Sequence, residues 1–191
     1  MVDLEKVERA TRMLLEGIGE DPDRPGLKET PGRVARMWQE LVAGMDQSAD
    51  EIVTTIPVEY YDEIILLRGI PLVSTCEHHL VPFIGKAHVA YLPKKGRLTG
   101  LSKLARIVEM EARKLQVQER LTSAIADDIV RTLEPRGVMV VVEAEHLCMT
   151  IRGALKPGVQ TVTSVVRGRF RVNAATRAEA FSLLTGSRRN P

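Results

Sequence analysis

The chain has 191 residues, of which 44% are hydrophobic and 27% charged, and its formal net charge is only +2. This length fits one domain of ordinary size with a short appendage, and the hydrophobic content can fill a core without disulfides. The small net charge argues against a nucleic-acid-binding protein, and no apolar run is long enough to cross a membrane. The first residues do not resemble a signal peptide, so we expect a cytoplasmic protein with reduced cysteines.

Hydrophobic residues at helical spacing predict two N-terminal helices, over residues 3–18 and from about 30 to 44. The second helix begins at Thr30-Pro31, a pair that favours Thr30 as the N-cap and proline at the first helical position. We expect residues 1–50 to form an N-terminal helical extension and residues 51–191 to form the main domain.

The remaining chain alternates between strand and helix signals. Strands are predicted over 63–67, 84–92, 138–148 and 161–172, and helices over 101–115, 118–133 and 176–184. Strands joined through adjacent helices in this order predict an α+β fold, with helices on one face of a largely antiparallel sheet. Three arginines alternate along the last predicted strand and would form a basic stripe there, at Arg167, Arg169 and Arg171.

Both cysteines of the chain lie close to histidines. Cys76 and His79 have the Cys-x-x-His spacing that places two zinc ligands on one turn. His146 and Cys148 are two residues apart in a predicted strand, so we expect both side chains on the same face. Cys76, His79 and Cys148 therefore predict a zinc site with three protein ligands.

Three protein ligands leave the fourth tetrahedral position open for water, as in catalytic zinc sites. The alternative is a closed structural site, in which His78 or His146 is the fourth ligand. A simpler alternative is that both cysteines are small buried residues. A histidine that does not bind metal would sit beside it as a proton carrier, because imidazole titrates near neutral pH.

Basic residues suggest an anion site. Ser102 and Lys103 fall in the first turn of a predicted helix, where free backbone N–H groups and the helix dipole favour anions. The other cations that would suit a polyphosphate are Arg106, Arg152, Arg33 and Arg36. Each of these residues taken alone is compatible with an ordinary solvated helix face.

Glu119 is a candidate for base recognition within Gln116-Val117-Gln118-Glu119-Arg120-Leu121. An ionised carboxylate only accepts hydrogen bonds, so it can take two N–H groups from a guanine edge. The alternative is an acidic residue in the first helical turn, where the helix dipole favours it.

Taken in order, these strings closely resemble the GTP cyclohydrolase I family. The matching strings are Ser-Thr-Cys-Glu-His-His at 74–79, Gly-Leu-Ser-Lys at 100–103, Gln-Val-Gln-Glu-Arg-Leu at 116–121, and His-Leu-Cys at 146–148 followed by Arg152-Gly153. The resemblance implies a tunnelling fold (T-fold) and a homodecamer of two stacked rings with active sites at subunit interfaces. It also implies conversion of GTP and water to 7,8-dihydroneopterin triphosphate and formate, the first step of folate or pterin synthesis.

Carried over by position, the resemblance implies a role for each candidate residue. The implied zinc ligands are Cys76, His79 and Cys148, and the implied acid–base histidines are His78 and His146. The implied guanine contacts are Gln118 and Glu119. The implied triphosphate contacts are Ser102, Lys103, Arg106 and Arg152, joined from a neighbouring subunit by Arg33 and Arg36. Two alternatives are a related T-fold nitrile reductase with a cysteine nucleophile and a nicotinamide cofactor, and a closed-zinc scaffold without turnover.

Overall fold

A five-stranded sheet forms the centre of the protein, for which a computed structural model describes residues 2–56, 61–94 and 97–186. In spatial order its strands are β5 (Leu115–Gln116), β2 (Ile65–Cys76), β3 (Pro82–Leu92), β6 (Gly137–His146) and β7 (Gln160–Gly168). All neighbours are antiparallel except β2 and β5, which run parallel. Two short strands, β1 (Thr55–Ile56) and β4 (Leu98–Thr99), pair separately. The predicted α+β fold with a largely antiparallel sheet is confirmed.

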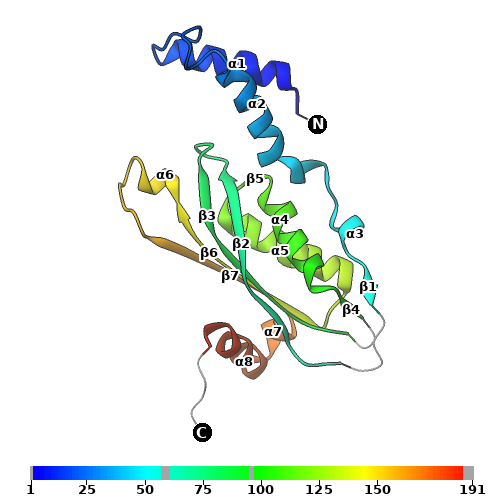
Figure 1. Ribbon diagram of the computed structural model, residues 1–191. Coiled ribbons are helices and arrows are strands. Elements are labelled where there is room, and N and C mark those ends of the chain that lie inside the picture. Colours follow the sequence, from blue (N-terminus) through cyan, green and yellow to red (C-terminus); the bar gives the residue numbers. More distant parts are fainter. Residues whose placement is uncertain (1, 57–60, 95–96, 187–191) are drawn as a thin grey trace.

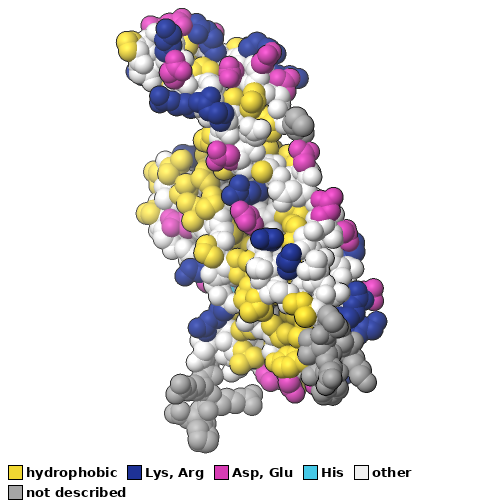
Figure 2. Space-filling model, turned by 45° about the vertical axis from the view of Figure 1, so that its right-hand side comes forward, with side chains coloured by type: hydrophobic (Ala, Val, Ile, Leu, Met, Phe, Trp, Pro, Cys, Tyr) yellow, Lys and Arg dark blue, Asp and Glu magenta, His cyan; other side chains and the backbone are white. Residues whose placement is uncertain are grey.

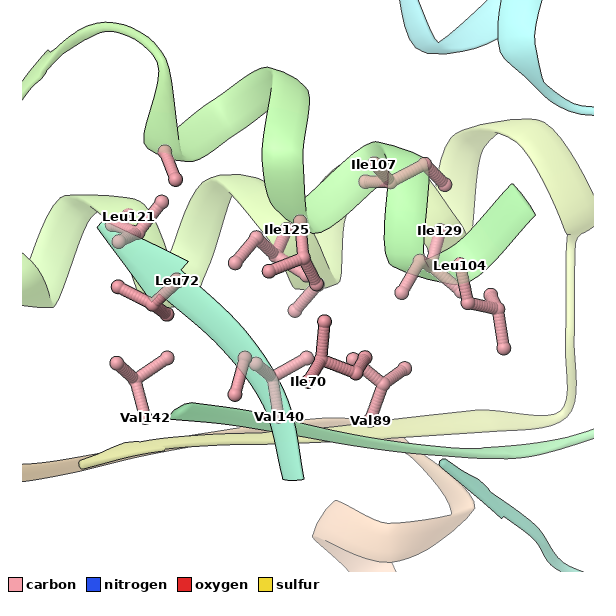
Figure 3. Close-up of a cluster of buried hydrophobic side chains, with 14 of the residues drawn as sticks. Ile70, Leu72, Val89, Leu104, Ile107, Leu121, Ile125, Ile129, Val140 and Val142 are labelled. Atoms are coloured by element: carbon pink, nitrogen blue, oxygen red, sulfur yellow. The ribbon is translucent and has the colours of Figure 1, made fainter. Parts of the chain in front are cut away.

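Two helices, α4 (Leu101–Ala112) and α5 (Gln118–Leu133), cover one face of this sheet (Figure 1). Side chains from α4 and α5 point toward alternate residues of the strands, because successive strand residues face opposite sides (Figure 3). The fully buried residues of this core include Leu104, Ile107, Leu121, Ile125, Ile129, Val89, Val140 and Val142. The prediction of helices on one face is confirmed for these two.

The C-terminal helices α7 (Arg169–Val172) and α8 (Ala174–Thr185) add cover on the opposite face of the sheet. Phe170 and Ala180 pack there against strand residues that alternate with those of the main core, namely Ala90, Leu92, Met139 and Val141. None of the helices in the described residues is long and apolar enough to cross a bilayer.

The N-terminal helices α1 (Leu4–Gly17) and α2 (Thr30–Leu41) form a hairpin that projects from one end of the sheet (Figure 1). A 3₁₀ turn, η1 (Ala43–Asp46), and the short α3 (Ala49–Ile52) lead from it into the sheet. Both predicted helices are confirmed. The prediction that Thr30 is the N-cap of α2 is wrong, because the helix already includes Thr30 and its cap is Glu29, without a side-chain hydrogen bond. The division at residue 50 stays a prediction.

Two predicted strands end earlier than expected. β6 ends at His146 and a short helix, α6 (Leu147–Thr150), follows, so the prediction that Cys148 shares a strand face with His146 is wrong. The Ile151 N–H donates to the Leu147 carbonyl at 3.0 Å and closes this helical turn.

β7 ends at Gly168, whose φ of +57° favours glycine and whose Cβ would lie 2.4 Å from the carbonyl oxygen of Arg136. The remaining arginines of the predicted basic stripe, Arg169 and Arg171, lie in α7, so that stripe is also wrong.

Candidate metal centre and nucleotide site

The turn between β2 and β3 carries the first two predicted metal ligands. Cys76 ends β2, and its carbonyl accepts from the Leu80 N–H at 2.9 Å while its own N–H donates to the Val81 carbonyl. This closed turn presents His79 beside Cys76. Since β3 also pairs with β6, the chain after β6 arrives at the same end of the sheet and brings Cys148.

The three ligand atoms come together as predicted. One ring nitrogen of His79 and the two cysteine Sγ atoms lie within 4.8 Å of one another. Around a tetrahedral zinc ion with Zn–S bonds of about 2.3 Å, ligand atoms stand about 3.7 Å apart, so this cluster needs only a small adjustment. Cys76 is buried and His79 is exposed, which leaves the cluster reachable from solvent on one side.

The donor chemistry of the cluster also fits a divalent cation. Burial raises the pKa of the Cys148 thiol, and the neighbouring Cys76 thiol raises it further. A bound cation reverses this effect, because a coordinated thiol loses its proton. Within the described residues the cluster has three members, and neither His78 nor His146 belongs to it. The alternative of a fourth histidine ligand therefore finds no support here.

The His146 side chain is held in a defined orientation next to the cluster. Its ring stacks on Phe83 with centroids 4.7 Å apart and an interplanar angle of 10°. Its Nε2 lies 2.7 Å from Oε1 of Gln118. Burial lowers the pKa of His146, and the carboxylate of Glu119 partly offsets this. The neutral imidazole is therefore favoured.

The predicted guanine-binding segment starts at the same end of the sheet. β5 pairs with β2 so that Gln116 lies opposite Cys76, and α5 begins two residues later. Glu119, in the first turn of α5, is exposed and available to a ligand. Gln118 is only 1% exposed, and its amide bonds to backbone and side-chain groups of the protein.

An ion pair that no sequence pattern predicts joins this segment to the metal-binding turn. The Arg120 guanidinium donates to the Glu77 carboxylate, to the Leu115 carbonyl at 2.7 Å and to Gln116 Oε1 at 3.0 Å. Arg120 thereby holds the pKa of Glu77 below its usual range. The only signal in the sequence was opposite charge within two motif strings, and no spacing rule pairs them.

Arg152 also lies near the cluster. It is exposed, and its charge acts against the rise in the pKa of the Cys148 thiol. Glu145 fastens the loop that carries Arg152, since its carboxylate accepts from the Thr150 hydroxyl at 2.9 Å and the Gly158 N–H at 2.8 Å. No pattern in the sequence singles out Glu145.

The predicted phosphate-binding residues of α4 lie elsewhere. The C-terminal end of α4 leads into β5 beside Cys76, so its first turn lies one helix length from the metal end. For the 12 residues of α4 that length is about 18 Å. β4, which precedes α4, lies at the end of the sheet opposite the β2–β3 turn (Figure 1). Ser102 and Lys103 are thus not brought to the metal cluster of their own chain.

The other basic candidates are also separate from the cluster. Arg106 lines a cavity of about 490 Å³ together with Arg113 and Leu72, between α4 and β2. Arg33 and Arg36 are exposed on α2, in the N-terminal hairpin. Within one chain the structure therefore joins the three metal-ligand candidates, His146, Glu119 and Arg152, and leaves these other cations apart.

The sequence of this chain is similar to those of a known protein family. Residues 7–185 match the family model described as GTP cyclohydrolase I. A GTP cyclohydrolase 1 of Pelotomaculum thermopropionicum is 60% identical over 186 residues, covering 97% of this chain and 99% of that protein. The GTP cyclohydrolase 1 of Carboxydothermus hydrogenoformans is 61% identical over 184 residues, covering 96% of each chain.

Among solved structures, the archaeosine synthase QueF-Like in the apo form matches with a TM-score of 0.48 and 16% identity, over 57% of this chain and 97% of that one. The family assignment rests on the sequence matches, which run almost the full length of the chain. The chain belongs to the GTP cyclohydrolase I family.

Proposed function

We propose that this protein is a zinc-dependent GTP cyclohydrolase, which converts GTP and water to 7,8-dihydroneopterin triphosphate and formate. The observation that carries the proposal is the meeting of Cys76, His79 and Cys148 within 4.8 Å, in a chain of the GTP cyclohydrolase I family. Three protein ligands leave one position of a tetrahedral ion open, the arrangement of catalytic rather than structural zinc.

Zinc fits the ligand set and would be held by the two thiolates and the imidazole. When bound, it supplies a Lewis acid that lowers the pKa of a coordinated water to about 7. The reaction consumes one net water. A first water opens the imidazole ring at C8 and a second water releases formate. Closure of the pterin ring, after rearrangement of the sugar, then releases one water.

The residues of the chain bind the base and move protons. The carboxylate of Glu119 accepts two N–H groups of the guanine edge, because an ionised carboxylate is an acceptor only. Gln118 belongs to the same guanine-recognition segment. Purine C8 is a poor electrophile until N7 is protonated, so an acid must stand near it. His78 and His146 are proposed as the groups that hold and transfer these protons.

The triphosphate is proposed to lie on Ser102, Lys103, Arg106 and Arg152, with Arg33 and Arg36 from a neighbouring subunit. The first turn of α4 lies about 18 Å from the metal end of its own chain, so Ser102 and Lys103 would serve the metal centre of another copy. We therefore propose a composite active site in a homodecamer of two stacked rings. The triphosphate is not cleaved, and its binding energy positions the base.

Exposed hydrophobic side chains favour such an assembly. Val73, Leu101 and Leu115 are 50%, 53% and 37% exposed in the single chain. Figure 2 shows hydrophobic side chains on the body of the molecule and mostly charged side chains on the N-terminal helices at its top. Contact with another copy would remove such surface from water. In this proposal residues 1–50 form an extension that carries Arg33 and Arg36 to a neighbour, residues 51–191 form the catalytic domain, and the enzyme works in the cytoplasm.

The activity itself is tested with purified protein and GTP. Formate and the fluorescent oxidised pterin should appear, with about one zinc per chain, as one three-ligand site requires. Metal-chelated protein and Cys148→Ser should yield neither product. Zinc without any product from GTP would favour a scaffold, and turnover that consumes a nicotinamide cofactor would favour a reductase.

The composite site is tested by mixing two inactive variants. Cys148→Ser lacks a metal ligand and Lys103→Ala lacks a phosphate contact. In ring assemblies formed from equal amounts of both, about a quarter of the sites would combine an intact metal centre with an intact α4 from the neighbour. Recovery of about that fraction of activity supports the composite site, and no recovery contradicts it.

A further inference from the structure

The side-chain amide of Gln118 has an orientation that chemistry alone decides. Its Nε2 lies 2.9 Å from the carbonyl oxygens of both Val142 and Thr161. Backbone carbonyl oxygens only accept hydrogen bonds, so the NH₂ group must face them. Turning the amide over would set three oxygen atoms against one another inside the protein. Oε1 must therefore lie on the other side, toward His146.

This orientation determines which nitrogen of His146 carries a proton. Oε1 of Gln118 lies 2.7 Å from Nε2 of His146 and has no proton to give. His146 must donate from Nε2, and in the neutral ring the lone pair then lies on Nδ1. Turning the His146 ring over would put a ring carbon at this short distance from Oε1 of Gln118, whereas the carbon and oxygen of a C–H···O contact are about 3.3–3.6 Å apart. The stack on Phe83 fixes the plane of the ring as well.

Two threonines complete a circuit of hydrogen bonds around Gln118. The Thr122 hydroxyl donates to the Gln118 backbone carbonyl at 2.7 Å, so it must accept from the Thr163 hydroxyl at 2.6 Å. The Thr163 hydroxyl in turn accepts from Nε2 of Gln118 at 3.2 Å. Both N–H groups of the amide thus face partners inside the protein, and the side chain is buried. No donor of Gln118 remains for a base.

We propose that Gln118 is a positioning residue, which holds His146 as the tautomer protonated on Nε2 and leaves Nδ1 to exchange protons with the substrate. Glu119 then makes the side-chain contact with guanine, and Gln118 acts on the reaction only through His146. The inference rests on the proposed cyclohydrolase activity. It predicts different kinetic effects for substitutions of Gln118 and Glu119, which are neighbours in one sequence motif.

Four substitutions separate positioning from base recognition. Gln118→Met removes every hydrogen bond of the amide at similar length. Gln118→Glu keeps the bond to His146, because a carboxyl buried against two carbonyls takes up its proton and offers one O–H donor and one C=O acceptor. Glu119→Gln removes the ionised acceptor for the base. Gln39→Met, at an exposed position of α2, is the matched chemical control.

The kinetic expectation is a split between kcat and KM. Gln118→Met should lower kcat about 10–100-fold, the usual loss when an orienting partner is removed. Its KM, and the Kd for GTP measured calorimetrically on chelated protein, should stay close to wild type. Gln118→Glu should recover part of kcat, Glu119→Gln should raise KM and Kd, and Gln39→Met should change neither. Zinc content and the thermal midpoint of each variant are measured alongside.

Nitrogen-15 NMR of histidine-labelled protein supplies a readout independent of turnover. The His146 signals are identified by their loss in His146→Gln. We expect Nε2 protonated and Nδ1 unprotonated in the wild type, and a mixture of tautomers in Gln118→Met. If Gln118→Met does not fold, the wild-type spectrum and Gln118→Glu decide.

A wild-type His146 protonated on Nδ1 would overturn the inference, as would Gln118→Met with raised KM and unchanged kcat. Failure of the wild type to turn over GTP would refute the proposed activity instead, and the spectrum would still report the tautomer.

Discussion

Replacing Gly85 by alanine tests how closely β3 and β6 approach each other beside the site. A Cβ on Gly85 would lie 1.9 Å from the carbonyl oxygen of Glu143 and 2.6 Å from the Cα of Ala144. Ordinary van der Waals contacts begin at 3.4 Å, so the distance between this Cβ and the Glu143 oxygen must increase from 1.9 Å to at least 3.4 Å. Both opposing atoms are backbone, and neither can turn aside as a side chain would. The strands themselves must therefore separate.

The strain acts close to His146. Gly85 pairs with Ala144, and two residues further along Phe83 pairs with His146, on which its ring also stacks. A misplacement of about 1 Å costs about 100-fold in rate when it reaches a catalytic group. Overpacking of this kind destabilises by about 1–3 kcal/mol. At about 2–4 °C per kcal/mol for a chain of this size, the thermal midpoint should fall by about 2–12 °C.

The assay measures kcat for pterin formation and the thermal midpoint on the same preparations. Gly17→Ala is the matched control, because a Cβ at Gly17 meets nothing within 4 Å. That variant should keep wild-type activity and stability. The reasoning is refuted if Gly85→Ala has wild-type kcat, zinc content and melting behaviour, since the two strands could not then approach as closely as their backbones indicate.

Three further predictions concern the metal, a buried carboxyl and the core. Chelation should lower the thermal midpoint, and added zinc should restore it, because a ligand that binds only the folded state stabilises it; an unchanged midpoint would argue against a bound metal. Burial raises the pKa of Glu111 in the folded protein above its usual 4.5. The stability contributed by the protonated carboxyl is therefore fully present below the pKa of Glu111 in the unfolded chain, and it is lost as the pH rises through the pKa in the folded protein. In urea titrations, the free energy of unfolding of Glu111→Gln should therefore rise relative to that of the wild type from acid to neutral pH. A difference between the two that does not change with pH would contradict this. Ile125→Ala, in the fully buried core, should cost about 2–5 kcal/mol in the same titrations, and a loss below 1 kcal/mol would show that the site is not tightly packed.

Local patterns predicted the elements that depend on local physics. The helix expected over 118–133 is α5 with the same bounds, because its apolar residues recur on one face and a turn follows it. Cys76 and His79 meet because a short turn joins them, and such spacing is visible in a sequence. The arrival of Cys148 depends on the pairing of β3 with β6, which no local pattern specifies.

The predictions were wrong where backbone conformation or hydrogen bonds to distant residues outweighed the local sequence pattern. Alternation continued past His146 in the sequence, yet a helix begins at Leu147. Gly168 ended a strand that composition alone would extend to Val172. The burial of Gln118 was also invisible, because its partners Val142 and Thr161 are backbone carbonyls of distant strands. Amino-acid composition does not indicate which backbone carbonyls of a fold require a side-chain hydrogen-bond donor.

The length of α4 explains why the candidate residues of a single chain do not all meet at one place. Its two ends are about 18 Å apart, with the candidate phosphate ligands Ser102 and Lys103 at one end and the metal end of the sheet beyond the other. Bringing them together within one chain would require breaking the core that α4 shares with the sheet through buried residues such as Leu104 and Ile107. In the proposed ring, a neighbouring copy would supply the missing half without breaking this core. Activity should therefore be lost when the assembly dissociates, even where each subunit keeps its fold and its metal.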